Sequence, residues 1–123
     1  MLMLTYILLY LYLFIGTFVK SAFDGKGELH LKNGDFYSGS FKNNRFDRQG
    51  ILYTASGDEY DGIWHRGRPL GQMRVSMANG DVYEGMMDTT YHGTGRMEYG
   101  CNLGSYEGQW SKGKPHGKGK RIH

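Results

Sequence analysis

The chain has 123 residues and a formal net charge of +3, which is room for one domain and too small a basic excess to indicate nucleic-acid binding by itself. Glycine accounts for 20 residues, roughly twice its usual share, while the 10 tyrosines, 6 phenylalanines and 2 tryptophans are candidates for burial. This composition excludes collagen, which needs glycine at every third position, and it disfavours long helices and disordered glycine linkers. We therefore predict an all-β chain with many tight turns.

Residues 1–19 carry no charged side chain, and the sequence leaves three interpretations of this segment open. A membrane anchor is one, although residues 1–13 as a helix span only about 20 Å of the roughly 30 Å hydrocarbon core. A signal peptide is another, although no basic region precedes the apolar run. The third is an apolar cap on the first repeat, or a mistaken start of a longer protein. If the segment does span a membrane, Lys20 and Lys26 favour a cytoplasmic location for the remainder.

A repeat of 23 residues begins directly after this segment. The pattern Tyr-x-Gly-x-large occurs at residues 37–41, 60–64, 83–87 and 106–110, and one period earlier the frame reaches residues 14–18. We therefore divide the chain into an N-terminal segment, 1–13, and five units, 14–36, 37–59, 60–82, 83–105 and a truncated 106–123. The fourth unit has an early Gly93-Thr-Gly95 and a late Gly104, which predicts loops of different length between strands that stay in register.

Each unit reads as two short antiparallel strands and two turns. Residues two apart in a strand share a face, so Tyr60, Gly62 and Trp64 point the same way, and a ring from the next strand is expected to fill the space above Gly62. Asn-Gly-Asp at 33–35 and 79–81 supplies the positive-φ positions of tight turns. An isolated hairpin is marginal in water, so ten such strands should stack into one elongated, twisted antiparallel meander. The residues predicted to define the repeat are Phe14, Gly16, Tyr37, Gly39, Tyr60, Gly62, Trp64, Tyr83, Gly85, Tyr106, Gly108 and Trp110.

These motifs resemble the MORN (membrane occupation and recognition nexus) repeat over residues 14–123. The fifth unit is the most similar, with Tyr106-Glu-Gly-Gln-Trp110 followed by Lys114-Pro-His-Gly-Lys-Gly119. Arg48, Met73 and Met87 depart from the pattern at positions where glycine or an aromatic residue is usual. The resemblance implies scaffolding, membrane-associated and cytoskeletal roles, with no chemistry in the repeats themselves.

The residues offer no reactive constellation, so we predict a protein that is not an enzyme and has no cofactor or metal. His92 and His116 occupy one repeat position, which favours a structural explanation over metal ligation. Asp35, Asp58 and Asp81 recur in turns and are expected to serve those turns rather than to bind calcium. The single cysteine, Cys101, has no neighbouring base, and its lack of a partner within the chain suits a reducing compartment.

The last residues are basic and contain no acid. Lys112, Lys114, Lys118, Lys120 and Arg121 are candidate contacts for an anionic surface, or else a solvated chain end. We predict a non-catalytic scaffold in the cytoplasm that binds a partner protein and associates with a membrane or the cytoskeleton. One alternative is a membrane tether with an inserted N-terminus and a lipid-contacting C-terminus, and another is a repeat fragment of a larger regulatory enzyme or signalling protein. Nucleic acid is not an expected partner, and the oligomeric state stays open.

Overall fold

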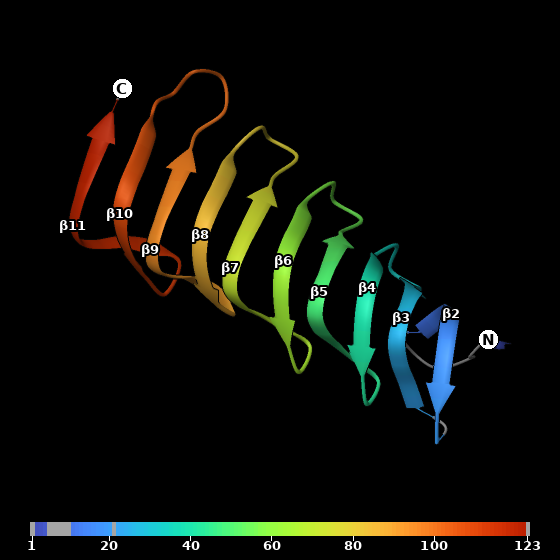
Figure 1. The fold of residues 1–123 in the computed structure, drawn as a ribbon. Helices are drawn as coiled ribbons and strands as arrows, with labels where there is room; N and C mark the ends of the chain where they lie inside the picture. The colour runs from blue at the N-terminus through green and yellow to red at the C-terminus, as the bar shows by residue number, and fades with distance from the viewer. Residues whose placement is uncertain (1, 5–10, 21, 123) are drawn as a thin grey trace.

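The computed structural model describes residues 2–4, 11–20 and 22–122, which form one antiparallel sheet with its strands in chain order (Figure 1). The eleven strands are β1 Leu2–Leu4, β2 Leu11–Val19, β3 Ala22–Leu31, β4 Phe36–Lys42, β5 Arg45–Tyr53, β6 Glu59–His65, β7 Arg68–Ser76, β8 Val82–Asp88, β9 Thr90–Glu98, β10 Ser105–Ser111 and β11 Lys114–Ile122. The predicted all-β meander is confirmed. The ten predicted strands correspond to β2–β11, and β1 adds a short strand beside β2.

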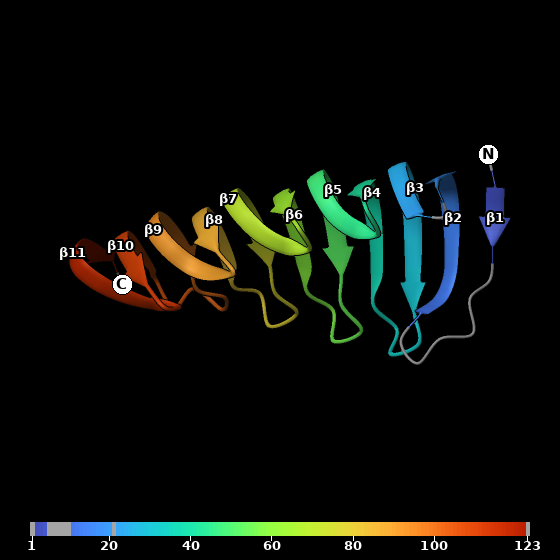
Figure 2. The ribbon, with the colours of Figure 1, turned by 90° about the horizontal axis from the view of Figure 1, so that it is seen from below.

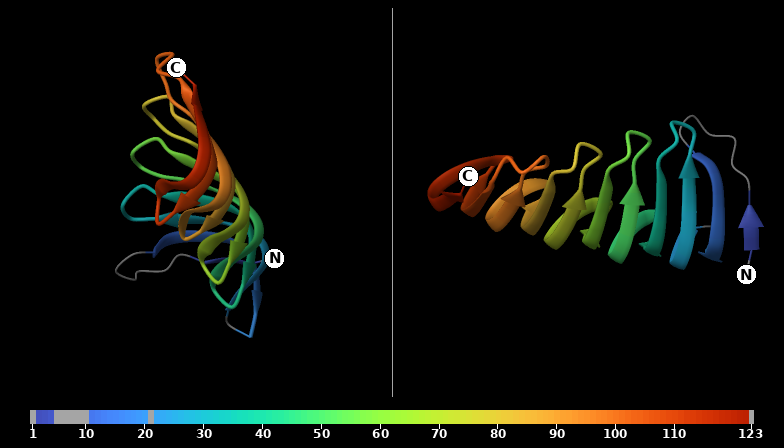
Figure 3. Two further views of the ribbon diagram at one scale, coloured as in Figure 1. Left: turned by 90° about the vertical axis from the view of Figure 1, so that its left-hand side faces the viewer. Right: turned by 90° about the horizontal axis from the view of Figure 1, so that it is seen from above.

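The sheet is a single elongated layer rather than a closed barrel or a sandwich. Figure 2 shows strands that bend along their length, and the end-on view of Figure 3 shows successive hairpins fanning out with the twist of the sheet. Since each strand pairs only with its neighbours in sequence, every buried ring is covered from within its own unit or from the adjacent one. Each hairpin is therefore stabilised by its contacts with the neighbouring hairpins, as in other repeat proteins.

The apolar N-terminal segment is partly accounted for by strands. The second strand pairs with β3 from Leu11 to Val19, and Leu2–Leu4 pairs with residues 14–16 of β2. Residues 1 and 5–10 of the predicted 1–13 segment lie outside the described residues. In the part of the chain that the structure describes, no helix is long and apolar enough to span a membrane.

A row of glycines crosses the sheet at one register position. Gly16, Gly27, Gly39, Gly50 and Gly62 are paired in succession from β2 to β6, and the row resumes from β8 to β11 with Gly85, Gly95, Gly108 and Gly119. On β7 the row is occupied by Met73, which pairs with Gly62 on one side and Gly85 on the other. We call this line the glycine row.

The glycines are needed because aromatic rings lie directly over them. A Cβ atom built on Gly50 would collide with the ring and hydroxyl of Tyr37, and one on Gly95 would collide with Tyr83 in the same way. The sequence predicted that a ring from the next strand fills the space above Gly62. At Gly62 that prediction is wrong in the kind of side chain, because a methionine rather than a ring lies there. Elsewhere in the row the ring comes from the preceding strand, as with Tyr37 of β4 over Gly50 of β5. Above Gly62 it is the Met73 side chain from β7 that fills the space.

The rings then pack into a ladder on what we call the aromatic face of the sheet. Tyr37 stacks on Phe46 with centroids 3.8 Å apart, and its hydroxyl donates to the Ser40 carbonyl at 3.0 Å. Trp64 meets both rings edge-on, and its indole N–H donates to the Gly50 carbonyl at 2.9 Å. The same arrangement recurs at the other end of the ribbon, with Tyr83 stacked on Tyr91, Trp110 edge-on to both, and the Trp110 indole N–H donating to the Gly95 carbonyl. The buried core consists of these rings together with Leu29, Met73, Val75, Met87 and Met97.

Met73 interrupts the ladder in the middle of the ribbon. Tyr37 and Tyr83 are 1% and 0% exposed, whereas Tyr60, at the same repeat position, is only half-buried. Among the described residues the Tyr60 hydroxyl makes no bond to Ile63 matching those that Tyr37 and Tyr83 make to the residue three further on. The side chain of Met73 occupies the place over the glycine row where the Tyr60 ring would lie.

The first glycine of each Gly-x-Gly motif has a different role. It lies at a bulge in the ladder and has a left-handed backbone, with φ of 71° at Gly25 and 89° at Gly93. Arg48 occupies this position in the second unit with φ of 64°, so a non-glycine residue carries the left-handed conformation there.

Loop length varies in the fourth unit while the register is kept, as the sequence indicated. Thr89 alone, with φ of 67°, separates the paired residues Asp88 and Thr90. The following turn is correspondingly longer and contains Cys101 and Asn102, both with positive φ. The two changes offset each other.

Candidate docking edge

The turns divide into two sets that occupy opposite long edges of the ribbon. Figure 1 shows tight turns along the lower edge, joining β4 to β5 and β6 to β7, and wider loops along the upper edge, joining β3 to β4 and β5 to β6. Because the strands alternate in direction, turns of one kind recur every second strand, about 10 Å apart. Each edge therefore presents the same stretch of the repeat several times in a line.

The tight turns gather basic side chains, and we call their line the basic edge. Lys42 pairs with Arg45 around Asn43 and Asn44, whose φ angles of 50° and 69° are those of a two-residue hairpin turn with both central residues left-handed. Arg66-Gly67 and Lys112-Gly113 form turns of the same kind. The exposed basic residues of this edge are Lys20, Lys42, Arg45, His65, Arg66, Arg68, Lys112 and Lys114.

Hydrogen bonds between successive turns hold the basic edge together. The Asn44 N–H donates to the Phe23 carbonyl at 3.1 Å, and the Asn44 side-chain oxygen accepts from the Phe23 N–H at 2.8 Å. The Gly67 N–H donates to the Phe46 carbonyl at 2.9 Å. These hydrogen bonds fix each turn to the hairpin before it, so the cations are held at a regular spacing along the edge.

A cleft of about 460 Å³ lies between the second and third of these turns. It is lined by Lys42, Asn43, Arg45, Asp47, His65 and Arg66. The basic groups outnumber the single carboxylate, so the cleft has a positive potential and attracts anions.

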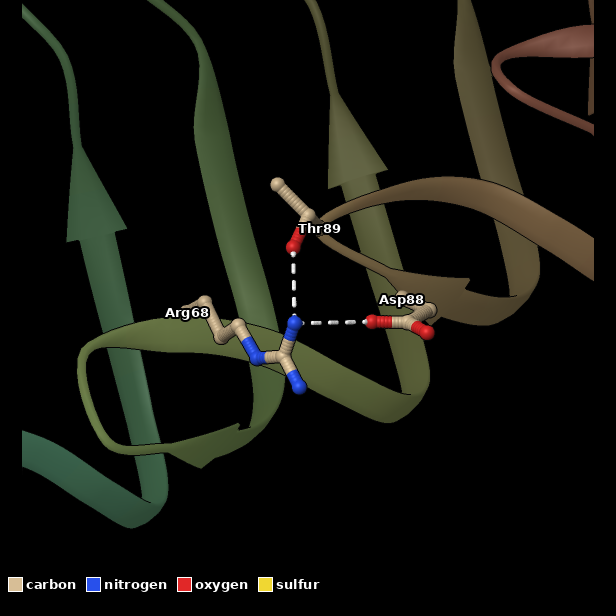
Figure 4. A network of polar contacts seen from close by, with 3 residues as sticks. All are labelled: Arg68, Asp88 and Thr89. Carbon is tan, nitrogen blue, oxygen red and sulfur yellow. Dashed lines mark hydrogen bonds and ion pairs between the residues drawn. The ribbon is translucent and has the colours of Figure 1, made fainter.

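An acid in the fourth unit interrupts the basic edge. Asp88 forms an ion pair with Arg68, with Nη1 and Oδ1 3.2 Å apart, and Thr89 accepts a hydrogen bond from the same Nη1 at 3.5 Å (Figure 4). Both charged side chains are half-exposed, so the pair contributes about 0–1 kcal/mol to stability. Its larger consequence is to neutralise Arg68, which leaves a basic cluster around the cleft and a second one at Lys112 and Lys114.

The wide loops carry the aspartates that the sequence assigned to their own turns. The Oδ1 atom of Asp35 accepts from the Ala55 N–H at 2.9 Å, that of Asp58 from the Ala78 N–H at 2.9 Å, and that of Asp81 from the Gly100 N–H at 2.8 Å. Each carboxylate therefore binds the following turn as well as standing in its own, which corrects the expectation of a purely local role.

The five C-terminal basic residues do not form one patch. Lys112 and Lys114 lie on the basic edge. The strand alternation places Lys118 and Lys120 on the face opposite the rings, which we call the polar face, where Lys120 pairs with Glu107. Arg121 lies on the aromatic face, with its guanidinium carbon 5.7 Å from the centroid of the Tyr106 ring. The sequence missed the basic residues 42–45 and 65–68, because their proximity arises only when the hairpins stack.

The polar face contains a second concave surface. A groove of about 690 Å³ follows the glycine row across β2 to β6, and its walls include Ile15, Lys26, Ser38, Ile51 and Asp61. The residues before and after each glycine project from this face and form the walls of the groove, whereas a Cβ atom on the glycines themselves would point to the aromatic face.

Within residues 2–4, 11–20 and 22–122, no three His, Cys, Asp or Glu side chains are close enough to hold a metal ion. Cys101 is exposed in the long turn of the fourth unit.

A single-layer sheet of 23-residue hairpin units, stacked through a ladder of rings over glycines, defines a β-repeat protein. The sequence profile of the MORN repeat matches residues 14–36, 37–59, 60–72 and 106–122, more than half of the chain. The chain belongs to the MORN repeat family. The third match ends just before Met73, and residues 83–105 have no match of their own although the structure keeps them in register. A comparison with curated proteins gave no match.

Proposed function

We propose that the protein is a non-catalytic scaffold that docks on an anionic membrane through its basic edge. The observation that carries the proposal is the alignment of exposed cations from separate hairpins along one edge, with the cleft at Arg45 and Arg66 as its most basic point. Each basic side chain near an anionic leaflet contributes about 1 kcal/mol of attraction, so a few aligned cations provide reversible binding. The elongated ribbon then leaves its polar face available to other partners.

The test is cosedimentation with vesicles of phosphatidylcholine, alone or with about a third of phosphatidylserine. Wild-type protein is expected to bind only the anionic vesicles, with an affinity that falls as salt is raised. The double variant Arg45→Glu/Arg66→Glu should lose at least about thirtyfold in affinity, from about 2 kcal/mol of lost attraction. The matched control is Lys118→Glu/Lys120→Glu, which makes the same change in net charge on the polar face and should change the affinity much less.

Equal losses in the two double variants would show that binding follows net charge rather than the edge, and would refute the proposal. Binding to acidic cytoskeletal filaments, with none to vesicles, would refute the membrane assignment while keeping a docking role for the edge. Carbonate extraction separates docking from insertion of the apolar N-terminus: a docked protein is released, and an inserted one stays with the membrane.

A second candidate function is protein binding in the groove of the polar face. The groove combines isoleucine side chains with hydroxyl and charged groups, which suits an extended polypeptide better than a lipid surface. The test is a comparison of copurifying proteins between Ile51→Glu and Arg45→Glu variants. A partner that is lost with the first variant and kept with the second supports the groove, and a partner lost equally with both contradicts it.

A further inference from the structure

The last strand of the sheet presents an open edge. In the sheet order, β11 pairs with β10 on one side, and among the described residues no strand lies on its other side. All nine of its residues are exposed. Its outward N–H and C=O groups are therefore available as a template for another strand.

The interior of the sheet shows what such a strand must contain. The strands that follow β3 and β9 each carry a tyrosine two residues before their glycine. On β4, Tyr37 lies opposite Leu29 and Gly39 opposite Gly27. On β10, Tyr106 lies opposite Met97 and Gly108 opposite Gly95. The equivalent positions of β11 are Arg121 and Gly119. An added strand in the same register has an aromatic residue opposite Arg121 and a glycine opposite Gly119, the two positions that Tyr37 and Gly39 hold on β4.

The charges on the polar face indicate which residue type the added strand has between its aromatic residue and its glycine. One row of this face alternates in charge from strand to strand, and its members, each paired with the next, are Asp61, Arg74, Glu84, Arg96, Glu107 and Lys120. Two of its contacts are ion pairs, with N–O distances of 2.6 Å between Arg74 and Glu84 and 3.6 Å between Arg96 and Glu107. The row ends in a cation, so the position opposite Lys120 on an added strand calls for an acid.

We propose that β11 is a docking edge for an extended acidic segment of a partner protein with the order aromatic, acid, glycine. The segment pairs antiparallel with β11, its acid opposite Lys120 and its glycine opposite Gly119. The further lysines of this strand, Lys114 and Lys118, strengthen the preference for an acidic segment. They also oppose pairing of β11 with the β11 of a second copy, because that pairing would bring like charges together.

The probe for this proposal is a labelled synthetic peptide with the sequence of β10, Ser105–Ser111, which has the required order. Its binding to the full chain is measured by fluorescence anisotropy, and amide hydrogen exchange locates it. The matched control is the same peptide with Glu107→Lys. We expect the acidic peptide to bind about fivefold more tightly than the control, and to slow exchange specifically in β11.

A charge exchange in the protein makes the result specific to one position. In the Lys120→Glu protein the preference should reverse in favour of the lysine peptide, and in Lys120→Gln it should disappear. The second variant also covers the case in which Lys120→Glu is destabilised by its neighbour Glu107. Equal affinities of the two peptides for wild type, binding of neither, or protection outside β11 would overturn the proposal. So would self-association of the free chain through β11, since the edge would then take a second copy.

Discussion

Replacing Gly95 by alanine tests the packing on which the whole ribbon depends. The added methyl group would occupy the position of the Tyr83 hydroxyl and ring carbons, and no left-handed backbone complicates the change at this glycine. Tyr83 is fully buried and its hydroxyl donates to the Met86 carbonyl at 2.6 Å, so the ring cannot move aside without losing its environment.

The cost follows from what the ring gives up. A tyrosine buries at least about 150 Å², worth up to about 4 kcal/mol, of which a partly displaced ring retains about half. Loss of the hydroxyl bond adds about 1 kcal/mol, and loss of the contacts with Tyr91 and Trp110 adds about another. We therefore expect Gly95→Ala to lower the free energy of unfolding by about 4 kcal/mol and Tm by about 10–15 °C.

Urea unfolding followed by circular dichroism and tryptophan fluorescence measures this loss. The control is a double-mutant cycle with Tyr83→Ala, because the methyl group at Gly95 should be tolerated once the ring is absent. Gly25→Ala is a second control, since nothing lies within 4 Å of the added atom and only the left-handed backbone, at φ of 71°, opposes it. A loss below about 1 kcal/mol for Gly95→Ala, or additive effects in the cycle, would refute the ring-over-glycine account.

Three further predictions concern the departures from the repeat and its buried tyrosines. Arg48→Gly should stabilise the protein by up to about 1 kcal/mol in urea titrations, because it relieves the left-handed backbone; a loss of stability would contradict this. Met73→Gly should cost less than the roughly 2–5 kcal/mol usual for truncating a buried methionine, since the Tyr60 ring can take the vacated place, and adding Tyr60→Ala should remove that compensation. Burial raises the pKa of Tyr83 and of Tyr91 to about 12, above the usual 10, so between pH 10 and 12 the folded state retains protons that the unfolded state has lost. The stability present below pH 10 should therefore decline between pH 10 and 12. A Tm that is flat over this interval would contradict the prediction.

Much of the fold can be read from the sequence because each signal is local. The period of 23 residues fixes which strands are neighbours, and the Tyr-x-Gly-x-large pattern places the rings on one face, since residues two apart in a strand share a side. The turn glycines, among them Gly34 and Gly80 with φ of 98° and 97°, mark where each hairpin reverses. These features need no knowledge of how distant parts of the chain meet.

The candidate docking edge could not be found in this way. Lys42 and Arg66 are 24 residues apart, and nothing near either one marks it as part of a site; they line one cleft only because two hairpins stack side by side. The consecutive basic residues at the C-terminus are adjacent in sequence but separated in space, because alternation in β11 directs Lys120 and Arg121 to opposite faces.

The sequence by itself therefore determined the repeat, its pairing and the class of fold, because these depend on spacing along the chain. The tertiary structure decided which strand supplies each ring, why Tyr60 is displaced by Met73, and which charges act together. These depend on bulges, on the bending of rings over glycines and on the sum of charges across neighbouring hairpins, which are properties of atoms that are close in space and distant in sequence.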